Sequence, residues 1–260
     1  MKKIIDQLLC ICIGFFAVAV LTSCDTTNSK SLDNKPTGPL TAKSEVTSEI
    51  KKAIILIDQK KYREAEITLT RIVSADDANF EAWQGLTQVH SAQAEQCIDN
   101  CGEDFEKNSN YPITDLNSFK TAGSHLDMAK VALSKLRNLS IDPTEEYSAE
   151  SFVSSENEFH RTEQYVRDAI DEFCFDQLKE ADMCAYKAID SRIHWVLPNN
   201  RHEIVNGLKY LKAVIALKPW ANEENLMELT RLYLKMKAAV ESGEWPSLLA
   251  QAGIVNNEMD

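Results

Sequence analysis

Apolar side chains recur every three or four residues along most of this chain, a spacing that places them on one face of an α-helix. The clearest stripe consists of Leu226, Leu229, Tyr233, Met236 and Val240. A stripe of this kind normally packs into a core. Alternation of apolar and polar residues, the pattern of a β-strand, is essentially absent. The pattern therefore predicts an all-α fold.

Breaks between the periodic segments set the expected helix boundaries. The chain of 260 residues has only eight glycines and seven prolines. Most of the prolines fall between the periodic segments, so long helices with short connections are expected. The predicted helices span residues 45–58, 62–75, 79–96, 117–139, 149–173, 177–195, 200–217 and 222–241.

The first residues follow a different pattern, because Lys2 and Lys3 precede an unbroken run of apolar or small residues from Leu8 to Leu21. As a helix this run would rise about 21 Å, which is short of the roughly 30 Å hydrocarbon core of a bilayer. A positive start followed by a short apolar run is typical of an export signal and not of a membrane span. We therefore expect residues 1–23 to be a signal peptide.

The apolar run ends in Leu21-Thr22-Ser23-Cys24. This sequence resembles the lipobox of bacterial lipoproteins, which has an aliphatic residue, two small residues and a cysteine that is lipidated. The resemblance implies cleavage before Cys24, acylation of that cysteine with chains such as palmitate, and anchoring of the new N-terminus in the membrane. The alternative is an ordinary signal peptide that happens to contain a cysteine.

Residues 24–44 are predicted to be a lipidated, flexible tether. They are rich in Thr, Ser, Asn, Lys and Pro, and Pro36 and Pro39 bracket Gly38, so they have too few apolar residues to bury a core. Asp25 is the second residue of the expected mature chain, a position where aspartate is associated in enteric lipoproteins with retention in the inner membrane. We therefore expect a lipid anchor in the bacterial cell membrane, a periplasm-facing body, and the inner membrane in preference to the outer.

The chain is acidic, with a formal net charge of −12 at pH 7. Nucleic acids and anionic lipid headgroups both need a basic surface, so this charge argues against them as direct partners. Solubility of the body is the simpler reason for the acidity.

Cysteine usage agrees with export. Cys10 and Cys12 leave with the expected signal and Cys24 takes the lipid, so four cysteines remain for the body: Cys97, Cys101, Cys174 and Cys184. An even number in an oxidising compartment makes them candidates for disulfides, with three connectivities open. We favour the two local pairs because residues 97–102 include the Asp, Asn and Gly typical of a turn. A zinc site is the weaker alternative because neither spacing is CxxC, and no metal or other cofactor is expected.

A second family resemblance lies between Lys60 and Leu86. The residues that carry it are Tyr62, Ala65, Leu69, Ile72, Trp83 and Leu86. At this spacing they resemble the tetratricopeptide repeat (TPR), a helix–turn–helix unit of about 34 residues that stacks into arrays. The resemblance implies that these residues fill the space between neighbouring helices and successive hairpins.

The resemblance is incomplete. Asp77, Thr87 and His90 stand where the repeat usually has proline, glycine and tyrosine. We expect TPR-like repeats over residues 45–105 and degenerate helical repeats over residues 106–254. Together they would form an irregular, right-handed array of helical hairpins.

The sequence contains no catalytic signature. Its five histidines form no HExxH motif, and neither GxSxG nor a glycine-rich phosphate loop occurs. Glu156 and His160 share one helix face and could form a metal or acid/base pair, but a solvated charged face is the simpler interpretation. Two further positions, residues 194–202 and Trp220, lie at helix breaks. Each is either a capped turn or a loop that binds a partner. We expect no enzyme activity, no catalytic residue and no metal ligand.

The TPR resemblance implies a binding function, since such arrays are usually scaffolds for a peptide or a partner protein. We therefore predict a membrane-tethered scaffold that binds a protein partner in cell-envelope assembly. The alternative resembles the T-component lipoprotein of tripartite ATP-independent periplasmic transporters, which would bind a solute-binding protein or a small hydrophobic ligand. A scaffold predicts an open groove and the transporter accessory an enclosed apolar cavity, while the oligomeric state stays open.

Overall fold

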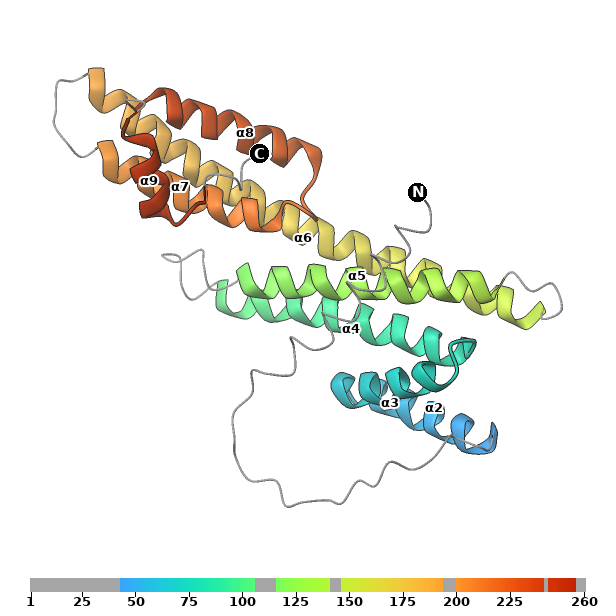
Figure 1. The fold of residues 1–260 in the computed structure, drawn as a ribbon. Coiled ribbons are helices and arrows are strands. Elements are labelled where there is room, and N and C mark those ends of the chain that lie inside the picture. The colour runs from blue at the N-terminus through green and yellow to red at the C-terminus, as the bar shows by residue number, and fades with distance from the viewer. Residues whose placement is uncertain (1–42, 106–115, 141–145, 194–199, 241–242, 256–260) are drawn as a thin grey trace, which may run out of the picture. The chain divides into compact units, whose positions relative to one another are not determined.

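The computed structural model describes residues 43–105, 116–140, 146–193, 200–240 and 243–255. This part of the chain is all helical and contains no strand (Figure 1), so the predicted all-α class is confirmed. Its helices are α2 (Lys43–Asp58), α3 (Tyr62–Ala75), α4 (Phe80–Phe105), α5 (Leu116–Leu139), α6 (Glu146–Ile193), α7 (Asn200–Leu217), α8 (Glu223–Ala238) and α9 (Trp245–Ala252).

Several helices begin and end where the apolar stripes predicted. α3 and α7 match the predicted ranges 62–75 and 200–217. The apolar stripe of α3 is buried as expected, with Ala65, Leu69 and Ile72 on one face of the helix. Local periodicity is sufficient here because the connections are short and the buried face is regular.

The turn predicted at residues 97–102 is wrong, because α4 continues through it to Phe105. Ile98 and Cys101 are buried in the main core, while the turn-forming Asp99 and Asn100 are exposed. Burial of the apolar face therefore decides the backbone conformation, and the weaker turn preference of Asp and Asn is overridden.

The two helices predicted at 149–173 and 177–195 are one helix, α6, of 48 residues. The residues between the two predicted ranges, Cys174 to Asp176, include neither glycine nor proline. Cys174 and Leu178 are buried on the same face as the residues on either side. No helix-breaking residue occurs here, and burial of the apolar face in the core stabilises a continuous helix.

Helix α9 is an element that the periodicity analysis missed, because its eight residues are too few to show a stripe. Pro246 lies in the first turn of the helix. Gly253, whose φ is 72°, is the C-cap residue that ends it. Those are the usual start and stop signals of a helix. Leu248 and Leu249, in the middle of the helix, are buried in the main core, where α9 packs beside α7.

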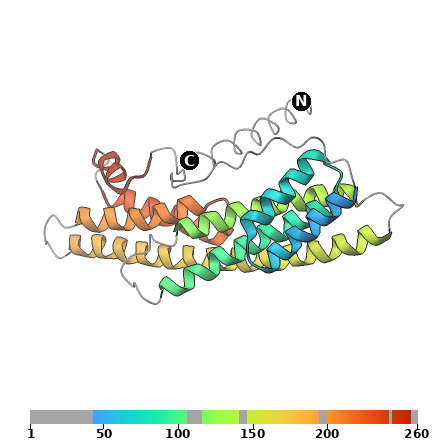
Figure 2. The same ribbon diagram turned by 90° about the horizontal axis from the view of Figure 1, so that it is seen from below.

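Helices α2, α3 and α4 share a small core, and Figure 2 shows α2 and α3, in blue, lying against the longer helices. α2 lies on α3, and both contact α4. The buried residues of this small core are Ile50, Ala53, Ala65, Leu69, Ile72, Val73, Ala82, Leu86, Val89 and Ala132. Ala132 belongs to α5, so the small core meets the rest of the body at that helix.

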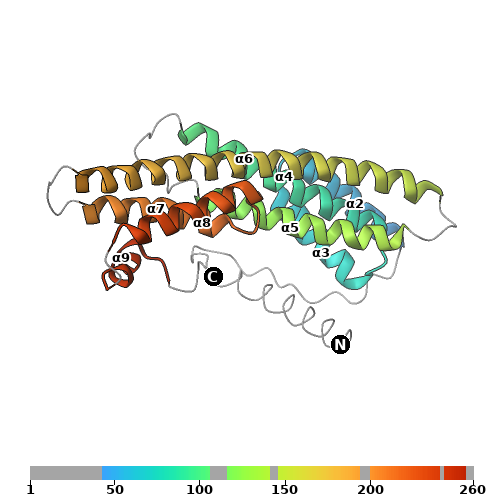
Figure 3. The ribbon, with the colours of Figure 1, turned by 90° about the horizontal axis from the view of Figure 1, so that it is seen from above.

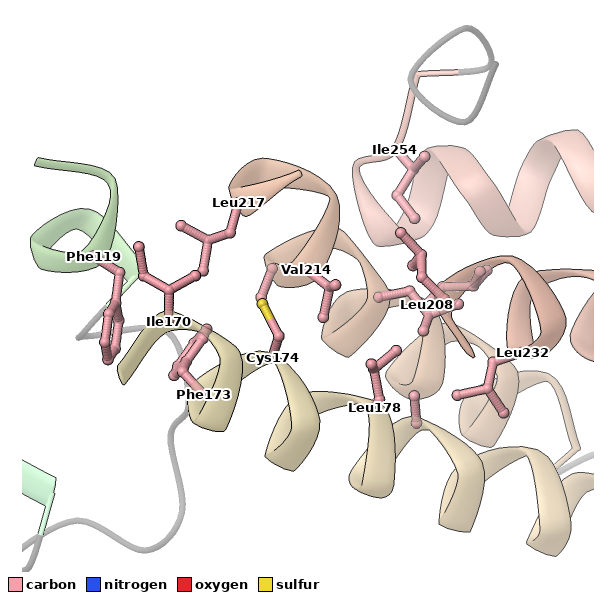
Figure 4. Packing of buried hydrophobic residues seen from close by; sticks show 14 of the residues in the cluster. Phe119, Ile170, Phe173, Cys174, Leu178, Leu208, Val214, Leu217, Leu232 and Ile254 are labelled. Carbon is pink, nitrogen blue, oxygen red and sulfur yellow. The ribbon is translucent and has the colours of Figure 1, made fainter. Parts of the chain in front are cut away.

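The remaining helices share a larger main core. α6 contacts α4 and α5 along its first part and α7 and α8 along its second part (Figure 3). In Figure 4 Phe119 of α5 lies beside Phe173 of α6, with ring centroids 4.6 Å apart. Leu208 of α7 lies over the same helix near Leu178. Each fully buried side chain of this size contributes about 1.5–3 kcal/mol, so the α6 interface is a major source of stability.

Trp220, at the junction between α7 and α8, ties this junction to the middle of the body. Its indole lies against Gly123 of α5, where an added Cβ would stand 2.4 Å from the ring. The indole Nε1 donates to Asp127 Oδ2 of α5 at 3.2 Å, and the Trp220 carbonyl accepts from Arg167 of α6 at 3.3 Å. Trp220 is therefore a structural joint, which corresponds to the turn interpretation of this position.

Substitution of Gly123 tests that joint. Gly123→Ala gains up to about 1 kcal/mol of helix propensity, but the added methyl group must displace the Trp220 ring and overpacks the site. We expect a net loss of at least about 1 kcal/mol in the free energy of unfolding, measured by urea denaturation. Gly243→Ala is the control, because a Cβ there meets no atom within 4 Å. Equal effects of the two substitutions would contradict the joint.

Candidate functional site

The residues expected to anchor the chain, Cys24 and Asp25, lie outside the described residues, as do the signal peptide and most of the tether. The lipidation and the inner-membrane preference therefore stay predictions. The described body begins at residue 43, so any site in the structure belongs to the part that the anchor would hold.

The six residues of the TPR resemblance come together. Ala65, Leu69, Ile72 and Leu86 are buried in the small core, and Tyr62 and Trp83 pack against it. α3 and α4 approach closely at Gly85, where an added Cβ would stand 2.9 Å from Leu69 Cδ1. These residues therefore hold helices together and contribute no ligand-binding group by themselves.

Trp83 is the member of this set that reaches beyond the hairpin. Its Nε1 donates to the Asp77 carbonyl at 2.9 Å, and Lys135 Nζ of α5 lies 5.8 Å from the ring centroid. Lys135 also pairs with the Asp77 carboxylate at 3.1 Å. Because both charged groups are exposed, the Lys135–Asp77 pair contributes little to stability. The cation–π contact with Trp83 is a second link between α4 and α5.

No disulfide joins the four candidate cysteines in the part of the chain that the structure describes. Cys174 and Cys184 both lie on α6, where ten residues rise about 15 Å, which is beyond the reach of a disulfide. The preferred pair Cys174–Cys184 is therefore wrong. The turn on which the pair Cys97–Cys101 rested is absent, and the Cys101 thiol instead donates to the Cys97 carbonyl at 3.1 Å.

The other site residues suggested by the sequence make ordinary structural contacts and do not form a common site. Glu156 pairs with Arg137 of α5, while His160 lies 3.4 Å from Glu163, so the pair suggested by their spacing is not formed. Of residues 194–202, the first six lie outside the described residues. Arg201 pairs with Glu244.

A strip of polar groups on the outer side of α4 is the most developed surface feature of the described chain. Glu95 and Asp99 are one turn apart on α4. Glu95 Oε1 accepts from Thr162 of α6 at 2.6 Å, and Asp99 Oδ1 accepts from the Tyr165 hydroxyl of α6 at 2.8 Å. Arg161 lies 3.6 Å from Glu95. We call Glu95, Asp99 and Tyr165, together with Tyr62 on the opposite side, the acidic strip.

The two tyrosines flank the carboxylates from different helices. Tyr165 is 44% exposed, and its hydrogen bond to Asp99 is the main cause that raises its pKa to about 12. Burial, followed by the charges of Glu95 and Asp99, raises the pKa of Tyr62 on α3. Both phenols are therefore neutral, and the strip offers carboxylates between aromatic rings. Such a surface attracts cationic side chains by charge and by cation–π contact.

The acidic strip was missed because its members are far apart in the sequence. Glu95 and Asp99 have the i, i+4 spacing that puts two carboxylates on one helix face, which was the one local signal available. Tyr165 follows them by 66 residues, and only the packing of α6 on α4 brings its hydroxyl to Asp99. Sequence periodicity predicts faces of helices and does not predict which faces meet.

A second surface feature is a hollow along the start of α6. Its walls are Ala149, Glu150, Val153, Ser154 and Asn157, all from one helix face, and it is open to solvent. No group of three or more His, Cys, Asp or Glu residues in the described ranges is arranged to hold a metal ion. The acidic strip is thus the feature in which polar groups from several helices converge.

The chain matches no protein-family model, no curated protein and no solved structure. Among the helices that the structure describes, none combines the length and the apolar character that crossing a membrane requires.

The cysteines are expected to persist as protected thiols. Burial is the main cause that raises the pKa of Cys174 to about 12 and that of Cys184 to about 11, and burial also raises the pKa of Cys97. At pH 8 iodoacetamide should therefore modify Cys174 and Cys184 at least about a hundredfold more slowly in the folded protein than in urea. Mass spectrometry without reductant should then find them alkylated after unfolding. A disulfide-linked peptide would contradict this.

Proposed function

We propose that this chain is a lipid-anchored helical scaffold of the bacterial cell envelope, tethered through Cys24, facing the periplasm and binding a protein partner. The observation that carries the anchor is the lipobox-like Leu21-Thr22-Ser23-Cys24 after a short apolar run. The described body supports the scaffold part of the proposal, because it presents several long helices with polar side chains arranged across their junctions.

The TPR-like interpretation is best supported in α2, α3 and the first half of α4. There the residues that carry the resemblance share one small core. Beyond them the body is organised along α6, whose 48 residues greatly exceed the length of a helix in a 34-residue hairpin repeat. We therefore propose a TPR-like hairpin attached to a bundle of longer helices, in place of degenerate repeats over the whole of residues 106–254.

The acidic strip is the docking surface that we propose. Asp99 and Tyr165 are exposed, and Glu95 and Tyr62 are half-buried. The carboxylates come from α4, and the neighbouring tyrosines come from α3 and α6. Charge complementarity therefore favours a basic segment of a partner protein, with lysine or arginine side chains seated on Glu95 and Asp99. The same charge would repel an anionic bilayer surface, so the strip would face away from the membrane.

The anchor is tested by removing the lipidated side chain. Cys24→Ala should leave the helical circular dichroism spectrum unchanged and move the protein from the membrane fraction to the soluble fraction, because the acyl chains supply the membrane affinity. Cys10→Ala is the matched control, since that cysteine lies inside the expected signal peptide, and this variant should stay in the membrane fraction. A Cys24→Ala protein that resists a salt wash would show that the anchor is misassigned.

The docking surface is tested by photo-crosslinking in intact cells. A photoreactive residue at Tyr165 should capture a partner protein, whereas the same residue at Met227 on α8, which is 63% exposed, should not. Adding Asp99→Lys should lower the yield from position 165 by about tenfold, the effect of losing roughly 1.4 kcal/mol of binding free energy. Capture at position 227 alone, or a yield at position 165 that charge reversal does not change, would rule out the strip.

A further inference from the structure

Two histidines lie face to face where α4 packs against α5. His90 of α4 and His125 of α5 have ring centroids 5.7 Å apart and ring planes inclined by 26°. His90 is 7% exposed, and His125 is half-buried. A proton added to either ring would therefore place a charge against the other ring with little water to solvate it.

The pair is linked to α3 through a short chain of polar contacts. The His90 Nδ1 donates to Gln93 Oε1 at 3.2 Å if its proton is on that nitrogen. The Gln93 amide then donates to Glu66 Oε2 of α3 at 3.4 Å. On the other ring, His125 Nδ1 is buried without a hydrogen-bond partner among the described residues. We call His90, His125, Gln93 and Glu66 the histidine latch, because together they join α3, α4 and α5.

The electrostatics of the latch favour neutral rings. Burial lowers the pKa of His90, partly offset by the hydrogen bond to Gln93. Burial is also the main cause that lowers the pKa of His125; the neighbouring His90 lowers it further, and the Glu66 carboxylate raises it. The charged group that faces the pair from α3 is thus Glu66, α4 presents His90 with the uncharged Gln93, and α5 presents His125.

We propose that the histidine latch is a proton-sensitive joint, which holds the α2–α3 hairpin closed on α4 and α5 while both imidazoles are neutral and releases it when the pair takes up a proton. A proton on one ring is poorly solvated while α3 covers the pair, so withdrawal of the hairpin, which admits water to the rings, is favoured. Glu66 leaves with the hairpin when the contact through Gln93 is broken, so water must then solvate the imidazolium in place of the Glu66 carboxylate.

The hairpin is the part of the body best suited to move. Its buried residues form a small core, which meets the main core around α4, Trp83 and Ala132. The hairpin contributes few buried apolar residues and shares their small core with α4 and α5, so it opens at a lower free energy than the global unfolding of the protein. Release would carry Tyr62 away from the acidic strip and uncover Leu69 and Ile72. The joint belongs to the folded body, so the proposal rests neither on the lipid anchor nor on the identity of a partner bound at the strip.

The direction of the pH effect follows from the lowered pKa values. An opened hairpin exposes the imidazoles, whose pKa values then approach the ordinary value of about 6.5. Below that pH the open state binds protons that the closed state does not, so closure weakens as the pH falls toward the lower pKa values of the closed state. Above about pH 7 both states are neutral at these rings, and closure no longer depends on pH.

Hydrogen exchange on the mature, detergent-solubilised chain tests the proposal. After correction for intrinsic exchange, peptides from α2 and α3 should lose protection by about tenfold between pH 7.5 and pH 5.0, while peptides from α7 and α9 keep theirs. The combined substitutions His90→Gln and His125→Gln should abolish this difference. His202→Gln is the matched control, because His202 is an exposed histidine on α7, and it should behave as the parent chain does.

Three results would overturn the latch: unchanged protection of α2 and α3, a pH effect that persists in the double variant, or an equal loss of protection in every helix. A titration of the parent chain by NMR covers the case in which the double variant does not fold. The Cε1–H resonances of His90 and His125 should titrate below the ordinary imidazole value of about 6.5. Titration of either buried ring at or above the ordinary value of about 6.5 would contradict the proposal.

Discussion

The body depends on α6 being one uninterrupted helix. Its buried face runs from Phe159 to Ala188 and holds α4 and α5 along one part and α7 and α8 along the other. Because a continuous helix keeps its hydrogen bonds internal and its faces in register, contacts at the two ends are fixed relative to each other. Trp220 reinforces this by joining the α7–α8 junction to α5 beside α6. A break after Phe173 would divide the main core into two smaller cores. Each would bury less apolar area than the undivided core.

The acidic strip and the histidine latch are both consequences of this packing. α6 supplies Thr162 and Tyr165 to the carboxylates of α4, and α5 presents His125 to His90. The α2–α3 hairpin lies on the other side of α4 and contributes Tyr62 to one feature and Glu66 to the other. A movement of this hairpin would therefore change the docking surface directly. We propose that a lipid anchor would determine where the protein works, that the long helices form the rigid part of the body, and that the hairpin is the part that moves.

The sequence predicted those features that depend on one helix at a time. The stripe of α3 and the ends of α7 could be located because burial there follows local periodicity. The same reasoning placed a turn at residues 97–102 and a break near residue 175, where burial of Ile98, Cys101 and Cys174 keeps the backbone helical. The His90–His125 stack and the Tyr165–Asp99 hydrogen bond join residues far apart in the chain, so no local pattern could have found them. The lipobox-like Leu21-Thr22-Ser23-Cys24 is the opposite case, because this short motif predicts lipidation without any tertiary structure.

Continuity of α6 is best tested by the distance between its two parts. Spin labels at the exposed positions Glu150 and Met183, introduced as Glu150→Cys and Met183→Cys, should report a narrow distribution centred near about 50 Å, the rise of 33 residues of α-helix. Native cysteines that react with the spin label would be replaced by serine or alanine. Pulsed electron spin resonance covers this range. A distribution centred below about 40 Å, or two resolved populations, would mean that the helix is broken near residue 175 and that the body is not built on one continuous support.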